Sequence, residues 1–454
     1  MPKTGLSGRI AGLTVVLTIA GAHAAYGCTN TAGSTGYLNV DGSGAAVVPS
    51  PGPAPGVSSP LSRPVAGSPL FDRISGHVPT GFNLGSISTG RANARVTARV
   101  VADMGGTIGR QAISWKGIQP NRNLVSGACA YDWRGPDLVY EFLLMHGVRP
   151  LWVVADAPQW ANTLGGCTNN QSQCSMPPDA AHVIDYVDLL RAIAQRYPLS
   201  AAVEVWNEPN MGRYWKTPDP VAYDQLLHAA WDGMQSSYPA MRVLGGALSP
   251  IPYDTQDQSG RPIIGLSHFL DQMQADGAFA WMHGFSFHPY PGQPNPDIFK
   301  ATFTTLASYS GLADTRLFPD ELGIPTSVQA TVWSEHDQCA QLVDEFNWMN
   351  SGAPDLLPGN ALWAHVDGVL FHTETQKPGV SSDGYGFGDI RDDYQPPLAS
   401  GLPPVHELTT YWYKPRPVYL EFQRAFAATP PTTPSSSSCG TSAGPEVEYP
   451  ANSG

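Results

Sequence analysis

Two glutamates stand where short apolar runs end, and their side chains could transfer a proton and attack a carbon atom. Glu208 closes the run Val-Glu-Val-Trp-Asn and precedes Pro209, and Glu321 closes the run Arg-Leu-Phe-Pro-Asp, two residues before Gly323. Each run predicts a buried strand, because proline cannot donate to a sheet ladder and glycine permits a sharp turn. Poor solvation beside an aromatic ring and a proline favours the protonated form of the Glu208 side chain. Two such groups are what glycoside hydrolysis needs, one as proton donor and one as nucleophile.

The chain must bring these glutamates together, and its hydrophobic pattern indicates how. Short apolar runs alternate with longer stretches of helical periodicity. The runs that predict strands span residues 81–88, 107–115, 148–155, 203–206, 242–248, 284–288, 315–320 and 366–371. The stretches that predict helices span residues 91–104, 137–145, 184–193, 223–234, 267–273, 297–309, 337–349 and a last one that begins near 417.

This alternation predicts an α/β fold, a (β/α)8 TIM barrel with parallel strands. An open doubly wound sheet is the alternative, but no glycine-rich phosphate loop follows the first strand. In a barrel all the strands end on one face, where barrel enzymes keep their active sites. Glu208 after the fourth strand and Glu321 after the seventh would then face each other across that end of the barrel.

The composition excludes some classes of partner. The chain has 454 residues, with 25 Lys and Arg against 38 Asp and Glu, and a formal net charge of -13. An acidic chain does not favour nucleic acid or an anionic membrane bound through basic patches. No run after the N-terminal region is apolar enough to span a bilayer. An uncharged or weakly charged carbohydrate fits better as the partner, and no cofactor is expected.

The two ends of the chain predict segments outside the barrel. A positively charged start, an apolar core and a small-x-small site predict a secretory signal peptide over residues 1–25, and hence a secreted or periplasmic protein. Residues 26–70 are rich in Pro, Gly and Ser and predict a disordered linker, and residues 429–454 predict a disordered tail. The catalytic barrel is therefore expected over residues 71–428.

Export would place the six cysteines in an oxidising environment, where an even count predicts disulfides. Cys167 and Cys174 bracket a short polar loop and are the pair that we expect. The other four allow three pairings, among which the spacing does not choose: Cys28, Cys129, Cys339 and Cys439. A bond between Cys339 and Cys439 would tie the late chain to its tail. Ala-Tyr-Gly before Cys28 is a poor lipobox and does not favour a lipid anchor there.

The motif Trp-Asn-Glu208-Pro-Asn resembles glycoside hydrolase family 39 and the related bacterial endoglycosidases that cut exopolysaccharides. These are retaining enzymes of the large (β/α)8 clan whose acid/base and nucleophile glutamates close strands four and seven. Asp320-Glu-Leu-Gly323 matches the second position, and the resemblance extends from the Arg110 strand to the lead-in to the last helix. It implies that Glu208 is the general acid/base and Glu321 the nucleophile.

The same resemblance implies roles for further residues. Asn207 matches the residue that binds the sugar 2-hydroxyl, and Arg110 matches the arginine of strand two that helps to keep the nucleophile ionised. His288-Pro-Tyr290 ends strand six as in those enzymes, with Tyr290 close to the nucleophile. A cation and a hydroxyl donor stabilise the charged form of a carboxyl group, which agrees with a nucleophile at Glu321.

The eighth strand departs from the clan pattern. Many members end it with a tryptophan under the reacting sugar, whereas this chain has Val-Leu-Phe371-His372, so we expect Phe371 or His372 to serve instead. Trp160 and Trp215 lie just past strand ends and are candidate sugar platforms, because aromatic rings suit the apolar faces of pyranoses. Asp156 also ends a strand and is a candidate substrate contact.

Other polar residues receive no role in the chemistry. His283 and His288 could be taken for metal ligands, but no carboxylate triad accompanies them, so no metal site is expected. Glu204 alternates with the strand tip, and we expect it to point toward a helix as a structural residue.

These features predict a secreted, retaining glycoside hydrolase that cleaves β-linked or other equatorial bonds by double displacement. The long segments after the third and eighth strands favour endo action on a polysaccharide. An exo-glycosidase is the alternative within the class. From another class, the chain could be a secreted carbohydrate-binding barrel without catalysis, although the presence of both glutamates with Asn207 and Arg110 speaks against it.

Overall fold

The structure is a computed structural model that describes residues 77–84, 91–122, 131–162, 175–290, 297–313, 315–326, 333–351, 366–372, 388–392, 411–428, 430–445 and 447–449. All of them belong to one of the two compact units of the chain, which comprises Gly56–Arg122 and Tyr131–Gly454. The predicted signal peptide, the predicted linker and the expected bond between Cys167 and Cys174 lie outside the described residues. In the part of the chain that is described, no helix is long and apolar enough to cross a membrane.

Eight parallel strands form the central sheet, in the order β10-β1-β2-β3-β4-β5-β8-β9. Their bounds are Thr80–Asn83 (β1), Ile108–Ser114 (β2), Arg149–Ala155 (β3), Ala202–Val205 (β4), Val243–Leu248 (β5), Gly284–Phe287 (β8), Arg316–Pro319 (β9) and Val369–His372 (β10). The sheet closes between its two edge strands, where parallel bridges join Leu317 to Val366 and Leu322 to Phe371. The predicted (β/α)8 barrel is therefore confirmed.

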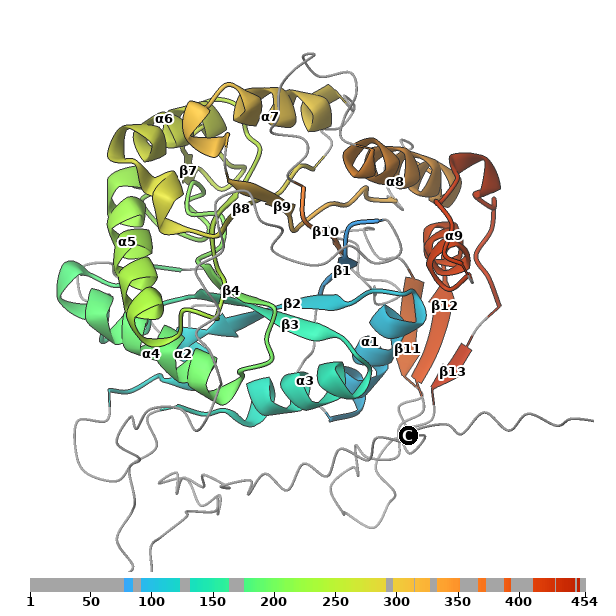
Figure 1. The fold of residues 1–454 in the computed structure, drawn as a ribbon, viewed down its shortest axis with the longest axis horizontal. Helices are drawn as coiled ribbons and strands as arrows, with labels where there is room; N and C mark the ends of the chain where they lie inside the picture. Colours follow the sequence, from blue (N-terminus) through green and yellow to red (C-terminus); the bar gives the residue numbers. More distant parts are fainter. Residues whose placement is uncertain are drawn as a thin grey trace, which may run out of the picture. The chain divides into compact units, whose positions relative to one another are not determined.

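Helices surround the strands on the outside of the barrel (Figure 1). The helices that follow the eight strands are Arg91–Asp103 (α1), Arg134–Met145 (α3), Val183–Arg196 (α4), Pro220–Ser237 (α5), Leu266–Asp276 (α6), Asp297–Ala307 (α7), Glu335–Asn350 (α8) and Pro417–Phe426 (α9). The shorter described elements are Trp115–Ile118 (α2), Thr255–Gln256 (β6), Pro262–Ile263 (β7), Gly388–Asp392 (β11), Tyr411–Pro415 (β12) and Val447–Tyr449 (β13).

Local sequence explains where two of these helices, α5 and α8, begin. Asp219 accepts a hydrogen bond from the Ala222 amide, and Pro220 occupies the first turn of α5, where its missing N–H is not needed. Ser334 and Asp337 bond each other's backbone amides in a capping box that starts α8. Both signals lie directly before amphipathic stretches, which is why the predicted and observed helices agree to within a few residues.

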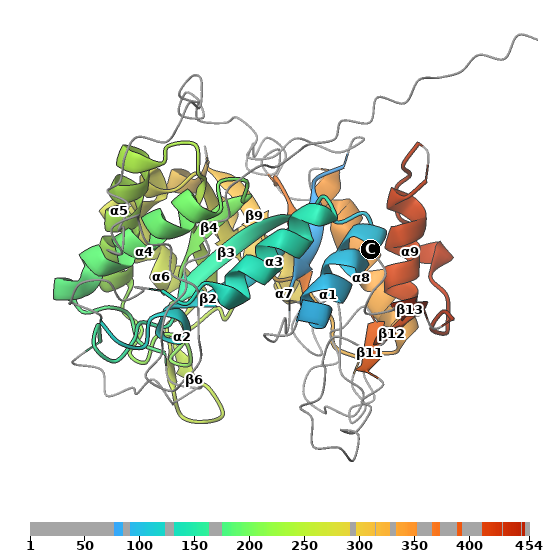
Figure 2. The same ribbon diagram turned by 90° about the horizontal axis from the view of Figure 1, so that it is seen from below.

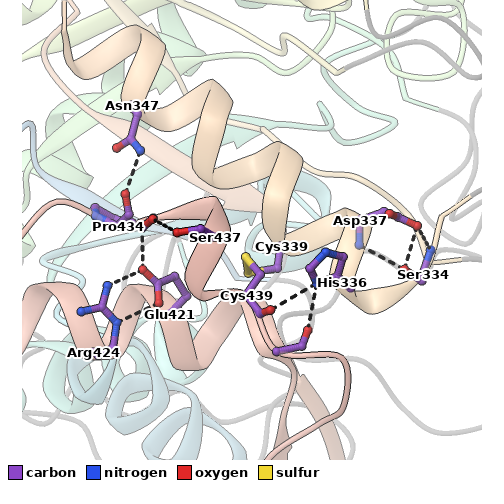
Figure 3. Close-up of a disulfide and its surroundings, with 12 residues drawn as sticks. Ser334, His336, Asp337, Cys339, Asn347, Glu421, Arg424, Pro434, Ser437 and Cys439 are labelled. Carbon is purple, nitrogen blue, oxygen red and sulfur yellow. Dashed lines mark hydrogen bonds and ion pairs between the residues drawn. A yellow bond between two sulfur atoms is a disulfide. The ribbon is translucent and has the colours of Figure 1, made fainter.

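The tail differs from the prediction of disorder wherever the structure describes it. Cys439 is bonded to Cys339 of α8, which realises one of the three pairings left open by the sequence. Asn347 of α8 donates to the Pro434 carbonyl (Figure 3). The Thr432 amide donates to the Ala425 carbonyl of α9. Helices α8 and α9 lie side by side in both views (Figures 1 and 2), and residues 430–445 are held against them. This segment is ordered despite its content of proline and serine, because a disulfide and backbone hydrogen bonds hold it in place.

Candidate active site

The inside of the barrel has an apolar layer with a polar layer above it. A buried apolar cluster consists of Ile108, Leu151, Val153, Ala201, Ala202, Leu244, Phe318 and Leu370. Alternate residues of a strand point to the same face. The residues that follow four members of this cluster by two positions are polar: Arg110, Glu204, Asp320 and His372. The barrel therefore gathers its charges at the C-terminal ends of the strands, which we call the mouth.

Glu204 belongs to this polar layer, and the expectation that it points toward a helix is wrong. Its side chain is fully buried and binds Arg110 inside the barrel. Ala202 of the apolar layer precedes Glu204 by two positions, so both side chains point into the barrel. Trp206 and Glu208 have positive φ angles of 73° and 41°, so the residues beyond the strand do not continue this alternation.

Arg110 lies at the centre of the polar layer and is 2% exposed. Its Nη1 donates to Glu321 Oε1 at 2.5 Å, and its Nη2 donates to Glu204 Oε1 at 2.5 Å and to Asn207 Oδ1 at 2.8 Å. Its Nε lies 3.0 Å from Asp320 Oδ2. Burial alone would lower the pKa of Arg110, but the surrounding carboxyl groups raise it well above its usual value. The guanidinium is thus a fixed cation whose three nitrogens face three different acidic side chains.

Glu321 receives several interactions that favour its ionised form. Burial opposes that form, yet the positive charges of His288, Arg110 and His372 outweigh it. The Tyr290 hydroxyl also donates to Glu321 Oε2 at 2.7 Å. Together these groups hold the pKa of Glu321 far below its usual range. A carboxylate that stays ionised and remains partly exposed at the mouth can act as a nucleophile.

His288 brings the two glutamates close to each other. Its Nδ1 lies 2.9 Å from Glu208 Oε1 and 3.6 Å from Glu321 Oε2. Because both oxygens lie near the same nitrogen atom, they are at most about 6.5 Å apart, the distance at which inverting pairs begin; retaining pairs lie about 5–5.5 Å apart. His288 is completely buried, so it is fixed between the two carboxyl groups.

The turn that carries Glu208 has a strained backbone. The residues outside glycine with positive φ in the described chain are Asp156, Trp206, Glu208 and Ala247, at or just beyond the ends of β3, β4 and β5. Such angles cost about 1–3 kcal/mol each and persist only where the surroundings impose them. Asn210 ties the turn after Glu208 to the segments beyond β5, because its buried side chain bonds the backbone of Ser249 and Ile264. We did not identify Asn210 from the sequence, although the Pro-Asn pair after Glu208 is a turn signal.

The structure brings together most of the predicted site residues. The side chains joined by the contacts above are Arg110, Asn207, Glu208, His288, Tyr290 and Glu321. His372 belongs with them, because its Nδ1 lies 4.0 Å from Glu321 Oε2. Phe371 does not, since it is fully buried on the outside of the strand against Phe346 and Phe422. Of the two alternatives for the eighth strand, only His372 reaches the mouth.

The predicted aromatic platforms fare differently. Trp215 is only 3% exposed and packs edge-on against Trp206 and Tyr223, so it cannot offer a ring face to a sugar and the prediction is wrong. The chain turns back after Glu208, which carries this tryptophan into the core rather than over the mouth. Trp160 is half-buried, and its Nε1 donates to the Gln119 carbonyl.

The role of Asp156 as a substrate contact remains a prediction, and so does the role of Trp160 as a sugar platform. The Asp156 carboxyl group lies 3.9 Å from Lys116 Nζ at the end of β3. Its φ of 63° marks it as one of the strained residues around the mouth. Among the described residues, no group of three or more His, Cys, Asp or Glu side chains is arranged to hold a metal ion.

Comparisons with known proteins support the fold rather than a close relationship. No protein-family model matches the sequence, and no curated protein matches it either. The structure is similar to that of a family 39 glycoside hydrolase from the gut symbiont Bacteroides cellulosilyticus WH2, with a TM-score of 0.52, 16% identity and coverage of 78% of this chain and 64% of that one. This chain thus spans less than two thirds of that protein's length.

Two further solved structures resemble the barrel to a similar degree. A monomeric beta-xylosidase from Caulobacter crescentus CB15 gives a TM-score of 0.50 at 16% identity, over 77% of this chain and 68% of that one. A GH39 enzyme from Xanthomonas axonopodis pv. citri gives 0.51 at 15% identity, over 78% of this chain and 68% of that one. The expected likeness to family 39 is therefore confirmed for the fold.

Proposed function

We propose that this chain is a retaining glycoside hydrolase. The observation that supports the proposal is the position of one His288 nitrogen between both glutamates, because it limits the separation of the two nearest carboxyl oxygens to about 6.5 Å, the lower edge of the inverting range. An inverting enzyme needs room for a water molecule between its carboxyl groups, and this spacing leaves less room for one. The unequal surroundings of the two groups fit the division of labour that double displacement requires.

In the first step Glu208, in its acid form, gives its proton to the glycosidic oxygen while Glu321 attacks the anomeric carbon. The carbon–oxygen bond breaks, the alcohol leaves with the proton, and a glycosyl ester forms on Glu321. In the second step the Glu208 carboxylate takes a proton from water, whose oxygen attacks the same carbon and releases Glu321. Two inversions at one carbon give net retention.

The neighbouring side chains support these roles. Arg110 and Tyr290 each hold one oxygen of Glu321, which leaves the carboxylate oriented for attack. His288 donates from Nδ1 to Glu208 and so fixes the position of the proton donor. Asn207 is anchored through Arg110 Nη2, and its amide nitrogen is left to donate to a sugar hydroxyl.

We propose that the substrate is a neutral, β-linked glycan cut internally by an exported protein. The acidic composition disfavours a polyanionic substrate, and the N-terminal pattern supports export. Removal of single xylose units is the second candidate, because one of the similar structures is that of a beta-xylosidase.

The purified chain should release reducing ends from at least one member of a panel of plant and bacterial polysaccharides. Nuclear magnetic resonance of the first product formed should show the β anomer before mutarotation. Oligosaccharide products would support internal cleavage, and monosaccharides alone would support the second candidate. An initial α anomer from a β-glycoside would refute a retaining mechanism, and binding without turnover of any glycan would indicate a carbohydrate-binding barrel.

A further inference from the structure

The single positive charge of Arg110 faces more carboxyl groups than it can neutralise. Its nitrogens contact carboxyl oxygens of Glu204, Asp320 and Glu321. The Glu204 and Asp320 side chains are completely buried, whereas Glu321 reaches the mouth. His288, the other buried cation here, lies closest to Glu208 and next to Glu321 at the mouth. An ionised carboxyl group without a counter-charge is expensive to bury, so one of the two completely buried acids should carry a proton.

The hydrogen bonds indicate which group is protonated. Glu321 accepts hydrogen bonds from Arg110 and Tyr290, which stabilise its ionised form. Among the described residues, Glu204 Oε2 and both oxygens of Asp320 accept no well-aligned hydrogen bond, and the Arg110 Nε that lies 3.0 Å from Asp320 Oδ2 is an ion-pair contact. Yet the two carboxyl groups are neighbours, because Glu204 Oε1 and Asp320 Oδ2 lie 2.5 and 3.0 Å from Nη2 and Nε of the same guanidinium. Two ionised carboxylates are acceptors only, so a bond between them requires a proton on one.

We propose that Asp320 carries this proton and donates a hydrogen bond to Glu204. Asp320 is then a positioning residue: because it is neutral, the positive charge of Arg110 interacts with Glu204 and Glu321. Its catalytic meaning rests on the proposed function, but the proton itself does not. Burial and the negative charge of Glu204 raise the pKa of Asp320 well above its usual value, which agrees with this assignment.

The groups around Asp320 explain what the proton does. Arg110 faces it from β2, Glu204 from β4 and His288 from β8, where Nε2 lies 3.6 Å from Asp320 Oδ1. An ionised Asp320 would compete with Glu321 for Arg110. It would also compete with Glu208 and Glu321 for the positive charge of His288. A neutral Asp320 therefore keeps both partners aimed at the two glutamates.

Infrared difference spectroscopy tests the proton without any substrate. At neutral pH an ordinary aspartate with a pKa of about 3.9 is ionised, whereas Asp224 and Glu345, whose pKa values burial raises to about 8, are protonated as well. The difference spectrum of the wild type minus Asp320→Asn should therefore show the carbonyl stretch of one further protonated carboxylic acid. The difference between the wild type and Asp188→Asn, which changes an exposed aspartate on α4, is the matched control and should lack that band. Absence of the band from the Asp320→Asn difference spectrum would overturn the proposal.

Thermal unfolding gives a second, independent readout. An acid whose pKa is raised on folding loses stability as the pH rises from its unfolded pKa toward its folded one. The Tm of the wild type should therefore fall over that window relative to Asp320→Asn, whose asparagine cannot titrate. At neutral pH the Tm of Asp320→Asn should be at or above that of the wild type. A clear fall would mean that Asp320 is an ionised partner of Arg110, and would overturn the proposal.

Kinetics then test the positioning role. Asp320→Asn keeps a neutral hydrogen-bonding group, so its kcat should exceed that of Asp320→Ala by about tenfold, the effect of one retained hydrogen bond, with similar KM values. Equal kcat values in the two variants would show that no neutral partner is needed and would refute that role. A wild type that has the infrared band but turns over no glycan would count against the proposed function alone.

Discussion

The mouth of the barrel and the seam formed by α8, α9 and residues 430–445 both join distant parts of the chain, but by opposite means. The mouth brings β2, β4, β8 and β9 together around one buried guanidinium and several acids. The seam packs Phe346, Phe422 and Phe426 against one another and adds a disulfide. The mouth is thus built from groups that are expensive to bury, and the seam from groups that gain by burial.

This contrast indicates that the seam contributes mainly to stability and the mouth mainly to catalysis. Buried ion pairs contribute little net stability, because desolvation offsets their attraction. Apolar contacts and a closed covalent loop contribute directly. We therefore expect substitutions at the mouth to change catalysis more than stability, and substitutions in the seam to do the reverse.

The largest effect should follow Glu321→Gln. Without the nucleophile the covalent step is lost, and kcat should fall by ~10⁵-fold. The Tm should stay the same or rise, because a buried charge is removed. Kinetics and calorimetry on the same preparation check both halves. A variant that unfolds at a much lower Tm would break the contrast, since the mouth would then hold the fold together.

Glu208→Ala should have the next largest effect, a loss of ~10³-fold on natural substrates, because general acid–base catalysis contributes about that much. A substrate whose leaving group needs no proton, such as a dinitrophenyl glycoside, should still form the glycosyl-enzyme, which then accumulates. Azide should restore turnover and give a glycosyl azide of the original anomeric configuration. In Glu321→Ala azide can only attack directly and should give the opposite configuration; the same anomer from both variants would reverse the assignment.

Arg110→Met should lower both the stability and the activity, since this one residue contributes to both. Removing one partner of a buried ion cluster costs about 3–5 kcal/mol of unfolding free energy. The pKa of Glu321 should rise, because Arg110 is among the cations that hold it down. The nucleophile must be ionised, so activity is lost as the pH falls through this pKa, and the acid limb of kcat/KM should move to higher pH. An acid limb at the wild-type position would show that Arg110 does not set this ionisation.

The smallest effect on catalysis should follow Cys339→Ser. The disulfide closes a loop of 100 residues, and its loss should lower the unfolding free energy by about 2–4 kcal/mol. The kcat at 25 °C should not change, because the bond lies on the outer helices. Cys439→Ser is the matched control and should behave identically, as each variant removes the same bond. A lower kcat in either variant would couple the seam to the mouth.

The sequence predicted the barrel well because its strands and helices depend on local patterns. Alternating apolar runs and capping signals are repeated along the chain, so an error in one element does not change the architecture. Glu208 and Glu321 were found for the same reason, since each stands at a strand end that the pattern identifies.

The rest of the site depends on contacts and backbone angles that no local pattern records. Glu204 points into the barrel toward Arg110, a partner 94 residues earlier in the chain. The turn after Glu208 buries Trp215, and one step of register separates buried Phe371 from His372 at the mouth. Asp320 went without a role because its importance lies in its neighbours on β2, β4 and β8. In the tail, the Pro- and Ser-rich composition predicted disorder, but the disulfide of Cys439 with Cys339 holds the segment in place.

The apolar layer below Arg110 has a kinetic consequence. Ile108, Ala202, Leu244, Phe318 and Leu370 are no more than 2% exposed, so water cannot reach the acid cluster from beneath. Among the described residues, exchange with solvent is therefore expected from the side of Glu208 and Glu321. A sugar bound there covers part of that side, so a hydrogen on Asp320 should exchange with deuterium more slowly in the substrate-bound protein than in the free protein.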